Sequence, residues 1–561
     1  MACVTITRVF LLFGRAPKHT VFRILLIAAI ALVYQALHLG LTIDEPSHFA
    51  AAQMYWLGDD VLHPVDTRPL TRMISGWVPL VLGTTRPPQT KAWPSNDAYD
   101  IGNEILQQPG TQFTVFCTRL PFLAFPLLTI WLAWHWGRQL FGERIGVVLA
   151  ACIALEPRIL GHGALIKSDV AAALGALWVA YETWQHWQTP TAHRLIRLTL
   201  ALVFAALVKY SLLPFVAIGY VVALIKGPRR IAAWFIPAAL YVAILMGSTF
   251  DVQPLRLTDF EPSLASALPQ NGAQFFDFVG RLPWPKQYVA GLLFVMASAK
   301  GAGFPAYFLG HSISGVVPLY YPLAWAIKVP IPLQILTVAG LVATLVRLRF
   351  RRAEFADFVI WAPSVLFFLL ATFSSYHIGF RHVLPILPLF LMGGGFALHR
   401  WSEETQRLVP VLLGWLVVSA CLFDPHGISY FNEWVGGPKN GWKYLADSNI
   451  DWGQNLPDLG AYIKRHRIES MHTFIMSSDY AWRCLRPGTI IPQPWPSDEP
   501  GAPRRYQPKP GYYAISVNVL TGFLFGKAHE DYLDYFLHAP IIGRAGYSIL
   551  MYRVDPAKGQ R

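Results

Sequence analysis

Long apolar runs recur along the first three quarters of the chain and restrict its fold more than any other feature. A membrane helix needs about 20 mainly apolar residues to cross a hydrocarbon layer roughly 30 Å thick. About eleven runs approach or reach that length. They cover approximately residues 21–41, 121–140, 145–160, 170–187, 198–208, 212–225, 231–248, 331–346, 358–372, 383–398 and 409–423.

Hydrophobic residues make up 54% of the chain and charged residues only 14%, which leaves too little polar surface for a soluble protein of 561 residues. We therefore predict an all-α polytopic membrane protein with about eleven transmembrane helices. Because cytoplasmic loops are rich in Lys and Arg, the basic residues at the span ends predict a cytoplasmic N-terminus. The groups are Arg8, Arg15, Lys18 and Arg23; Arg138 and Arg144; Arg194 and Arg197; Lys226, Arg229 and Arg230; Arg347, Arg349, Arg351 and Arg352; Arg400 and Arg407.

The formal net charge of +13 therefore reflects topology and contact with anionic lipids. Basic residues scattered at span ends, without a concentrated stripe, argue against nucleic-acid binding. This topology predicts a transmembrane module over residues 1–423, with external loops at 42–119 and 251–330. Residues 424–561 form a predicted external domain, in which a helix near 456–466 precedes strands at 512–519 and 548–554. We thus expect a small C-terminal α/β region.

Three carboxylates lie at the external ends of predicted spans. Asp44 and Glu45 follow directly after the first apolar run, and Asp169 opens the fourth. Charges are costly next to the hydrocarbon layer, so such residues are candidates for function. The alternative for Asp44 and Glu45 is capping of a helix end with contacts to headgroups or a neighbouring Arg. For Asp169 it is simple placement in a first helical turn after a Ser168 N-cap.

Basic residues lie at the same side of the predicted bundle. Arg119 begins the second span, Lys209 separates two apolar runs, and Arg381 with His382 opens the tenth span. Snorkelling to headgroups is the alternative for the two arginines. Lys209 has no charge near it in sequence and needs an anion from elsewhere in the fold or from a ligand. The aromatic and basic residues of 320–330 are explained at least as well by an interfacial belt as by binding.

These charges together describe a cavity at the membrane interface with carboxylates and phosphate-binding cations. Such a cavity suits the attack of an acceptor hydroxyl on the anomeric carbon of a sugar attached to a lipid phosphate. A carboxylate removes the hydroxyl proton as general base, and Arg and Lys stabilise the departing phosphate. A divalent metal held by carboxylates is an alternative device for the leaving charge.

At these residues the chain resembles the GT-C superfamily of polytopic glycosyltransferases that use polyprenyl-phosphate sugars. It is similar to the group formed by protein O-mannosyltransferases and the aminoarabinose transferases (glycosyltransferase family 39). The resemblance is carried by the Asp-Glu pair after the first span, Arg119-x-Pro121, Glu156-Pro157 through His162-Gly163 to Asp169, Val208-Lys209-Tyr210 and Phe380 to Pro385. Two runs of the tail, Tyr430 to Glu433 and Asp447 to Gln454, resemble bacterial members.

The resemblance implies inverting transfer on the external face of a bacterial inner membrane, without a metal cofactor. It assigns Asp44 as the base, Glu45 as a residue that assists or orients the acceptor, and Asp169 to the sugar site. The cations that it implies for the lipid phosphate are Arg119 and Lys209, with Lys91, Lys167, Arg381 and His382 as further candidates. The partners are a polyprenyl-phosphate-linked sugar, a hydroxyl-bearing acceptor and membrane lipids.

The acceptor stays open among protein, glycolipid and polysaccharide, since the central external loop carries no inserted β-trefoil domain. A transporter or flippase for lipid-linked sugars is the alternative function, and it predicts charges near the bilayer midplane and paired broken helices. An assembly subunit whose tail binds partners would leave Lys209 and Asp169 without a task. Exposed tryptophans of the tail could stack on sugars, although packing of a small domain explains Trp434, Trp442, Trp452 and Trp482 better.

Overall fold

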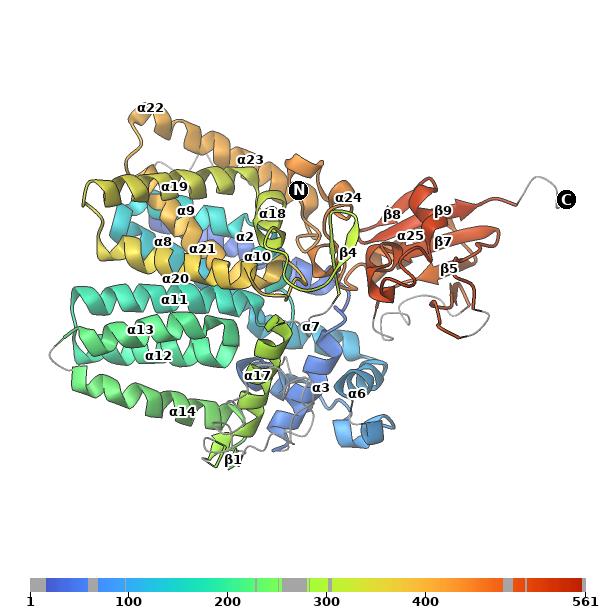
Figure 1. The fold of residues 1–561 in the computed structure, drawn as a ribbon, viewed down its shortest axis with the longest axis horizontal. Coiled ribbons are helices and arrows are strands. Elements are labelled where there is room, and N and C mark those ends of the chain that lie inside the picture. The colour runs from blue at the N-terminus through green and yellow to red at the C-terminus, as the bar shows by residue number, and fades with distance from the viewer. Residues whose placement is uncertain are drawn as a thin grey trace.

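The computed structural model describes residues 17–58, 69–95, 97–227, 230–250, 252–254, 280–281, 283–300, 305–477, 488–499 and 502–556. Parts of both predicted external loops, including residues 59–68 and 255–279, lie outside this set, as does Trp482. A large bundle of helices makes up most of the molecule, and a β-sheet formed by the C-terminal part of the chain lies at one end of it (Figure 1).

Each of the eleven predicted apolar runs forms helix in the structure. The helices are α2 (Pro17–His38), α8 (Ala124–Phe141), α9 (Glu143–Ala154), α10 (Pro157–Gly163), α11 (Asp169–Gln188), α12 (Ala192–Val208), α13 (Leu213–Ile225), α14 (Ile236–Gly247), α19 (Ile331–Arg349), α20 (Phe355–Thr372), α21 (Leu387–Leu398) and α23 (Leu408–Phe423). The predicted all-α membrane architecture is therefore confirmed.

The predicted number of spans is not confirmed. Among the described residues, five helical segments are long and apolar enough to cross a membrane, and α9 with α10 forms a sixth candidate that is bent by 59°. Several other apolar runs form helices of only 10–17 residues, such as 210–225 and 384–398. The chain is a multi-pass membrane protein whose apolar helices include several too short to span a membrane alone.

Short helices follow the first apolar helix and pack beside one another. They are α3 (Glu45–Trp56), α4 (Pro69–Ser75), α5 (Trp77–Val81), α6 (Ala98–Leu106) and α7 (Thr111–Arg119). Helix α3 packs closely on α6 because Gly102 has no side chain, and a Cβ there would lie 2.0 Å from the Pro46 carbonyl oxygen. This contact fixes the first turn of α3, which directly follows Asp44.

The C-terminal region contains a five-stranded sheet in the order β6 (Ile490–Pro492), β5 (Met471–Phe474), β7 (Gly511–Ser516), β9 (Ile549–Val554) and β8 (Gly543–Ala545). Strand β5 pairs in parallel with β6 and β7, and the other pairs are antiparallel. The predicted helix is confirmed as α25 (Leu456–His466). The strand predicted at 512–519 ends at Ser516, because the buried residues Val517–Leu520 turn into helix α27. A small α/β region is confirmed.

The segment between α23 and α25 packs against the helical bundle. Lys328, at the end of α18 (Tyr320–Lys328), is buried and donates hydrogen bonds to the carbonyls of Ile428 and Asn449. Asn432 donates to the carbonyls of Ala326 and Val329, at 2.7 Å each. Because Tyr320, Tyr321 and Lys328 are buried inside the protein, the interfacial-belt interpretation of 320–330 is wrong.

Candidate active site

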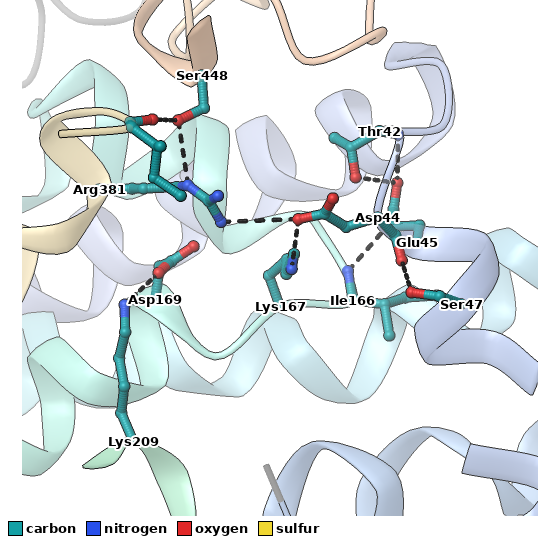
Figure 2. A network of polar contacts seen from close by, with 11 residues as sticks. Thr42, Asp44, Glu45, Ser47, Ile166, Lys167, Asp169, Lys209, Arg381 and Ser448 are labelled. Carbon is teal, nitrogen blue, oxygen red and sulfur yellow. Dashed lines mark hydrogen bonds and ion pairs between the residues drawn. The ribbon is translucent and has the colours of Figure 1, made fainter. Parts of the chain in front are cut away.

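Asp44 lies at the N-cap position of α3, where its side chain makes no capping hydrogen bond. Its Oδ2 atom instead lies 2.7 Å from Lys167 Nζ and 3.7 Å from Arg381 Nη1 (Figure 2). The side chain is 14% exposed, more than that of any partner in this cluster. The capping alternative does not describe Asp44, which faces two cations from distant parts of the chain.

Glu45 points in another direction and is completely buried. Its carboxylate forms a double hydrogen bond with Arg119, at 2.9 Å to Nε and 2.7 Å to Nη2. It also accepts hydrogen bonds from the backbone N–H groups of Thr42 and Ile166. Burial raises the pKa of this carboxyl, but the Arg119 charge and these hydrogen bonds outweigh it, so that the pKa lies below its usual value. Glu45 thus joins the segment before Asp44 to the segment before Lys167.

Arg119 has no donor left for a lipid phosphate in this arrangement. Besides Glu45, its guanidinium donates to the carbonyls of Ala36, Leu39 and Gly40 at 2.8–3.1 Å. All five N–H groups of the side chain are therefore used within the protein. The predicted role of Arg119 in phosphate binding does not fit this geometry, and a structural role for the Glu45–Arg119 pair does.

Asp169 and Lys209 form the second ion pair of the site. Lys209 Nζ lies 2.5 Å from Asp169 Oδ1, and both side chains are buried. Asp169 begins α11, while Lys209 follows the last residue of α12 in an extended conformation. The anion that Lys209 was predicted to need is thus Asp169. Within the part of the chain that the structure describes, Asp169 Oδ2 has no hydrogen-bond partner and can accept one from a ligand.

Arg381 and His382 lie in a short 3₁₀ turn, Phe380–His382, between α20 and α21. Arg381 Nε donates to Ser448 Oγ at 3.1 Å. The His382 ring packs edge-on against Tyr376, with 4.8 Å between ring centres. Lys91 is an exposed loop residue whose backbone N–H donates to Glu104, and no contact found among the described residues joins it to the cluster. The structure brings Lys167 and Arg381 to the carboxylates and leaves Lys91 outside.

Two residues of the tail complete the cluster and were not predicted as site residues. Ser448 contacts Arg381, and the Trp452 ring centre lies 4.1 Å from the Arg381 guanidinium carbon and 5.3 Å from Lys167 Nζ. The sequence alone favours packing within a small domain for Trp452, although the run Asp447 to Gln454 resembles bacterial members. A polar run that follows the last apolar helix and ends in Trp-Gly-Gln was the signal for its role.

Ion pairs join three cations of the cluster to two carboxylates. Lys167, Lys209 and Arg381 supply the cations and Asp44 and Asp169 the carboxylates, and the buried Asp447 carboxyl group also interacts electrostatically with Arg381 and Asp44. Three cations so close together can attract an anionic group. Among the described residues, no group of three or more His, Cys, Asp or Glu side chains is arranged to hold a metal ion. Lys167, Lys209 and Arg381 are cations that could each bind an anionic ligand.

A family model described as dolichyl-phosphate-mannose-protein mannosyltransferase matches residues 110–250. The matched part contains Arg119, Lys167, Asp169 and Lys209, and it confirms the resemblance to GT-C glycosyltransferases for that part of the chain. No curated protein matches the sequence.

Two crystal structures of ArnT from Cupriavidus metallidurans are similar in chain course. The apo structure has 13% identity and a TM-score of 0.46, and the structure bound to undecaprenyl phosphate has 11% identity and a TM-score of 0.43. Each alignment covers 96% of this chain and 98% of the other. These are distant likenesses of fold.

Proposed function

We propose that this protein transfers a sugar from a polyprenyl-phosphate donor to an acceptor hydroxyl on the extracytoplasmic face of the membrane, with inversion at the anomeric carbon. The observation that carries the proposal is the pairing of Asp44 with Lys167 and Arg381 beside the Lys209–Asp169 pair. One carboxylate shared by two cations can exchange partners with an incoming phosphate. The family match over residues 110–250 supports the same reaction class.

The donor is a phosphodiester with one negative charge, which the cations of the cluster can attract. When its phosphate enters, Lys167 and Arg381 can turn from Asp44 to the phosphate oxygens, because both anions compete for the same cations. Asp44 is then released from its two ion pairs and can accept a proton. Donor binding therefore prepares the base, and an acceptor hydroxyl is not activated before the donor is in place.

In the transfer step, Asp44 removes the acceptor hydroxyl proton while the acceptor oxygen attacks the anomeric carbon on the face opposite the phosphate. A new C–O bond forms, and the bond between the anomeric carbon and the phosphate oxygen breaks. The leaving group takes the bonding electron pair and becomes a polyprenyl monophosphate with a second negative charge. Lys167, Arg381 and Lys209 stabilise that developing charge.

Asp169 is proposed to hold the donor sugar. One oxygen is engaged by Lys209, and the other can accept a hydrogen bond from a sugar hydroxyl. The proposal includes no metal cofactor, since three protein cations already face the phosphate site. The proposed acceptor is a hydroxyl group of a protein, a glycolipid or a polysaccharide. The proposed location is the bacterial inner membrane, which the resemblance implies.

The position of the charges favours an enzyme over a transporter. Asp44 precedes α3, Asp169 begins α11 and Lys209 follows α12, so these groups lie at helix ends. The transporter alternative instead predicts charges near the middle of the spans. A site at helix ends suits a donor whose phosphate stays at the membrane surface while its chain stays in the lipid.

The experiment that tests the proposal is sugar transfer or release from a panel of radiolabelled polyprenyl-phosphate sugars by the purified protein in detergent, with and without EDTA. Turnover of one donor, unchanged by EDTA, is expected. Turnover that EDTA abolishes would replace the protein cations by a metal as the main stabiliser of the leaving group. Absence of turnover for every donor, together with movement of a lipid-linked sugar across liposomes, would overturn the proposal in favour of the transporter.

A further inference from the structure

The tail of the chain forms one wall of the site, although it is distant in sequence from every group assigned a chemical role except Arg381. We propose that Trp452 is a positioning residue, whose indole face holds Arg381 and Lys167 where both can pass from Asp44 to the donor phosphate. The inference rests on the proposed function, because it concerns the cations assigned to that phosphate.

The backbone beside Trp452 is fixed against the segment that leads to Asp44. Ile43 N–H donates to the Trp452 carbonyl, and Gly40 N–H donates to the Gln454 carbonyl, each at 2.9 Å. Gly453 between them has φ of +89°, a conformation that favours glycine, and a Cβ there would lie 3.3 Å from the Leu41 carbonyl oxygen. The tail and the segment carrying Asp44 thus form one local unit.

The side chain of Trp452 is only 2% exposed. Its ring centre lies 4.1 Å from the Arg381 guanidinium carbon and 5.3 Å from Lys167 Nζ, so that one ring contacts both cations that pair with Asp44. Ser448 supports Arg381 from the same tail, since its Oγ accepts from Arg381 Nε and donates to the Ile378 carbonyl. Two tail side chains therefore contact Arg381 directly, and the buried tail carboxylate of Asp447 interacts with it electrostatically.

An aromatic ring suits this task for an electrostatic reason. Its quadrupole attracts a cation, more strongly when the pair is shielded from water, but it adds no formal charge. A carboxylate in its place would add a negative charge to the cluster and compete with the phosphate for Arg381 and Lys167. The indole keeps two like charges close together and leaves both available to an anionic ligand.

The test compares Trp452→Phe with Trp452→Leu, because both remove the indole and only Phe keeps an aromatic face. The exposed Trp434, which lies in the same tail, provides the control Trp434→Ala. For each purified protein we would measure the affinity for undecaprenyl phosphate, the donor KM, kcat and the melting temperature. We expect the affinity and the donor KM of W452F to stay within about threefold of wild type. In W452L the affinity should fall and the donor KM should rise, each by about tenfold, while kcat changes less.

Equal donor KM and affinity in W452F and W452L, with both folded, would overturn the inference and leave the proposed function intact. If W452L fails to fold, Ser448→Ala replaces it, and unchanged donor affinity in that variant would likewise overturn the assignment of the tail. A wild-type protein that neither binds undecaprenyl phosphate nor transfers a sugar would contradict the proposed function itself, and the inference with it.

Discussion

Glu45 and Asp44 are adjacent in the chain, yet their surroundings are opposite. Glu45 is completely buried, and both of its oxygens are held by Arg119 and by backbone N–H groups. Asp44 is partly accessible, and among the described residues its ion pairs are made through Oδ2, with two cations that have other contacts as well. A carboxylate with every partner fixed stabilises the fold, whereas one that shares its cations with other groups can release them. The pair teaches that two adjacent acids can differ completely in burial and in how firmly their partners are fixed, and we propose the chemical role for Asp44 alone.

The largest expected effect comes from breaking the buried pair. Arg119→Met leaves the Glu45 carboxylate buried without its cation, which typically costs about 3–5 kcal/mol of stability. Lys167→Met leaves Asp44 with Arg381 and with access to water, so we expect a much smaller loss of melting temperature. Thermal unfolding in detergent measures both. The double variant E45Q/R119M should recover part of the loss, and a loss in K167M equal to that in R119M would break the comparison.

Lys209→Ala should weaken binding of the donor far more than binding of the acceptor. Removing a charge-assisted contact of about 1.5–3 kcal/mol predicts a rise of roughly tenfold to a hundredfold in donor KM. Steady-state kinetics with donor and acceptor varied separately measures the difference. Lys209→Arg keeps the charge beside Asp169 and serves as the control. An unchanged donor KM in the alanine variant would move the phosphate site elsewhere.

Asp169 is intermediate between the two acids, since one oxygen is paired with Lys209 and the other has no hydrogen-bond partner in the described part of the chain. Asp169→Asn should lower kcat/KM for the complete donor about tenfold through loss of a hydrogen bond to the sugar. Its affinity for undecaprenyl phosphate, which has no sugar, should change much less. Equal losses for both ligands would assign Asp169 to the phosphate rather than to the sugar.

Asp451 in the tail extends the comparison to a buried carboxylate that accepts hydrogen bonds from neutral donors, the Ser516 hydroxyl and Gly453 N–H. Burial raises its pKa from 3.8 to about 6. The folded state therefore favours the protonated form, and the contribution of Asp451 to stability is largest below pH 3.8 and lost as the pH rises through 6.

Asp451→Asn should accordingly raise the melting temperature by a few degrees at pH 7 and by less at pH 4.5. Thermal unfolding of both proteins at the two pH values gives the difference directly. A variant that is less stable than wild type at pH 7 would show that the ionised form is the one that the tail favours.

The sequence predicts the helices well because apolar runs of membrane length have few other stable states. The sequence cannot predict which of these helices cross the membrane, because helices such as α13 and α21 are short and their placement depends on neighbouring helices. Asp44, Asp169 and Lys209 could be found as rare charges at run ends. The commitment of Arg119 to Glu45 could not, since it depends on carbonyls of residues 36–40 that only the fold brings within reach. The contacts of Trp452 with Arg381 and Lys167 could not be predicted either, since only the fold brings these three distant residues together.

The most direct test of Asp44 as the base is a comparison of Asp44→Asn with Glu45→Gln in two assays, binding of undecaprenyl phosphate and transfer from the active donor. The amide introduced by D44N keeps the shape of the side chain but cannot act as a base. We predict that D44N binds the lipid phosphate at least as tightly as wild type, because Lys167 and Arg381 lose their competing anion, while transfer falls by roughly 10²–10⁴-fold. E45Q should lower the stability of the protein more than it lowers transfer. Wild-type transfer by D44N would contradict the assignment of Asp44 as the base.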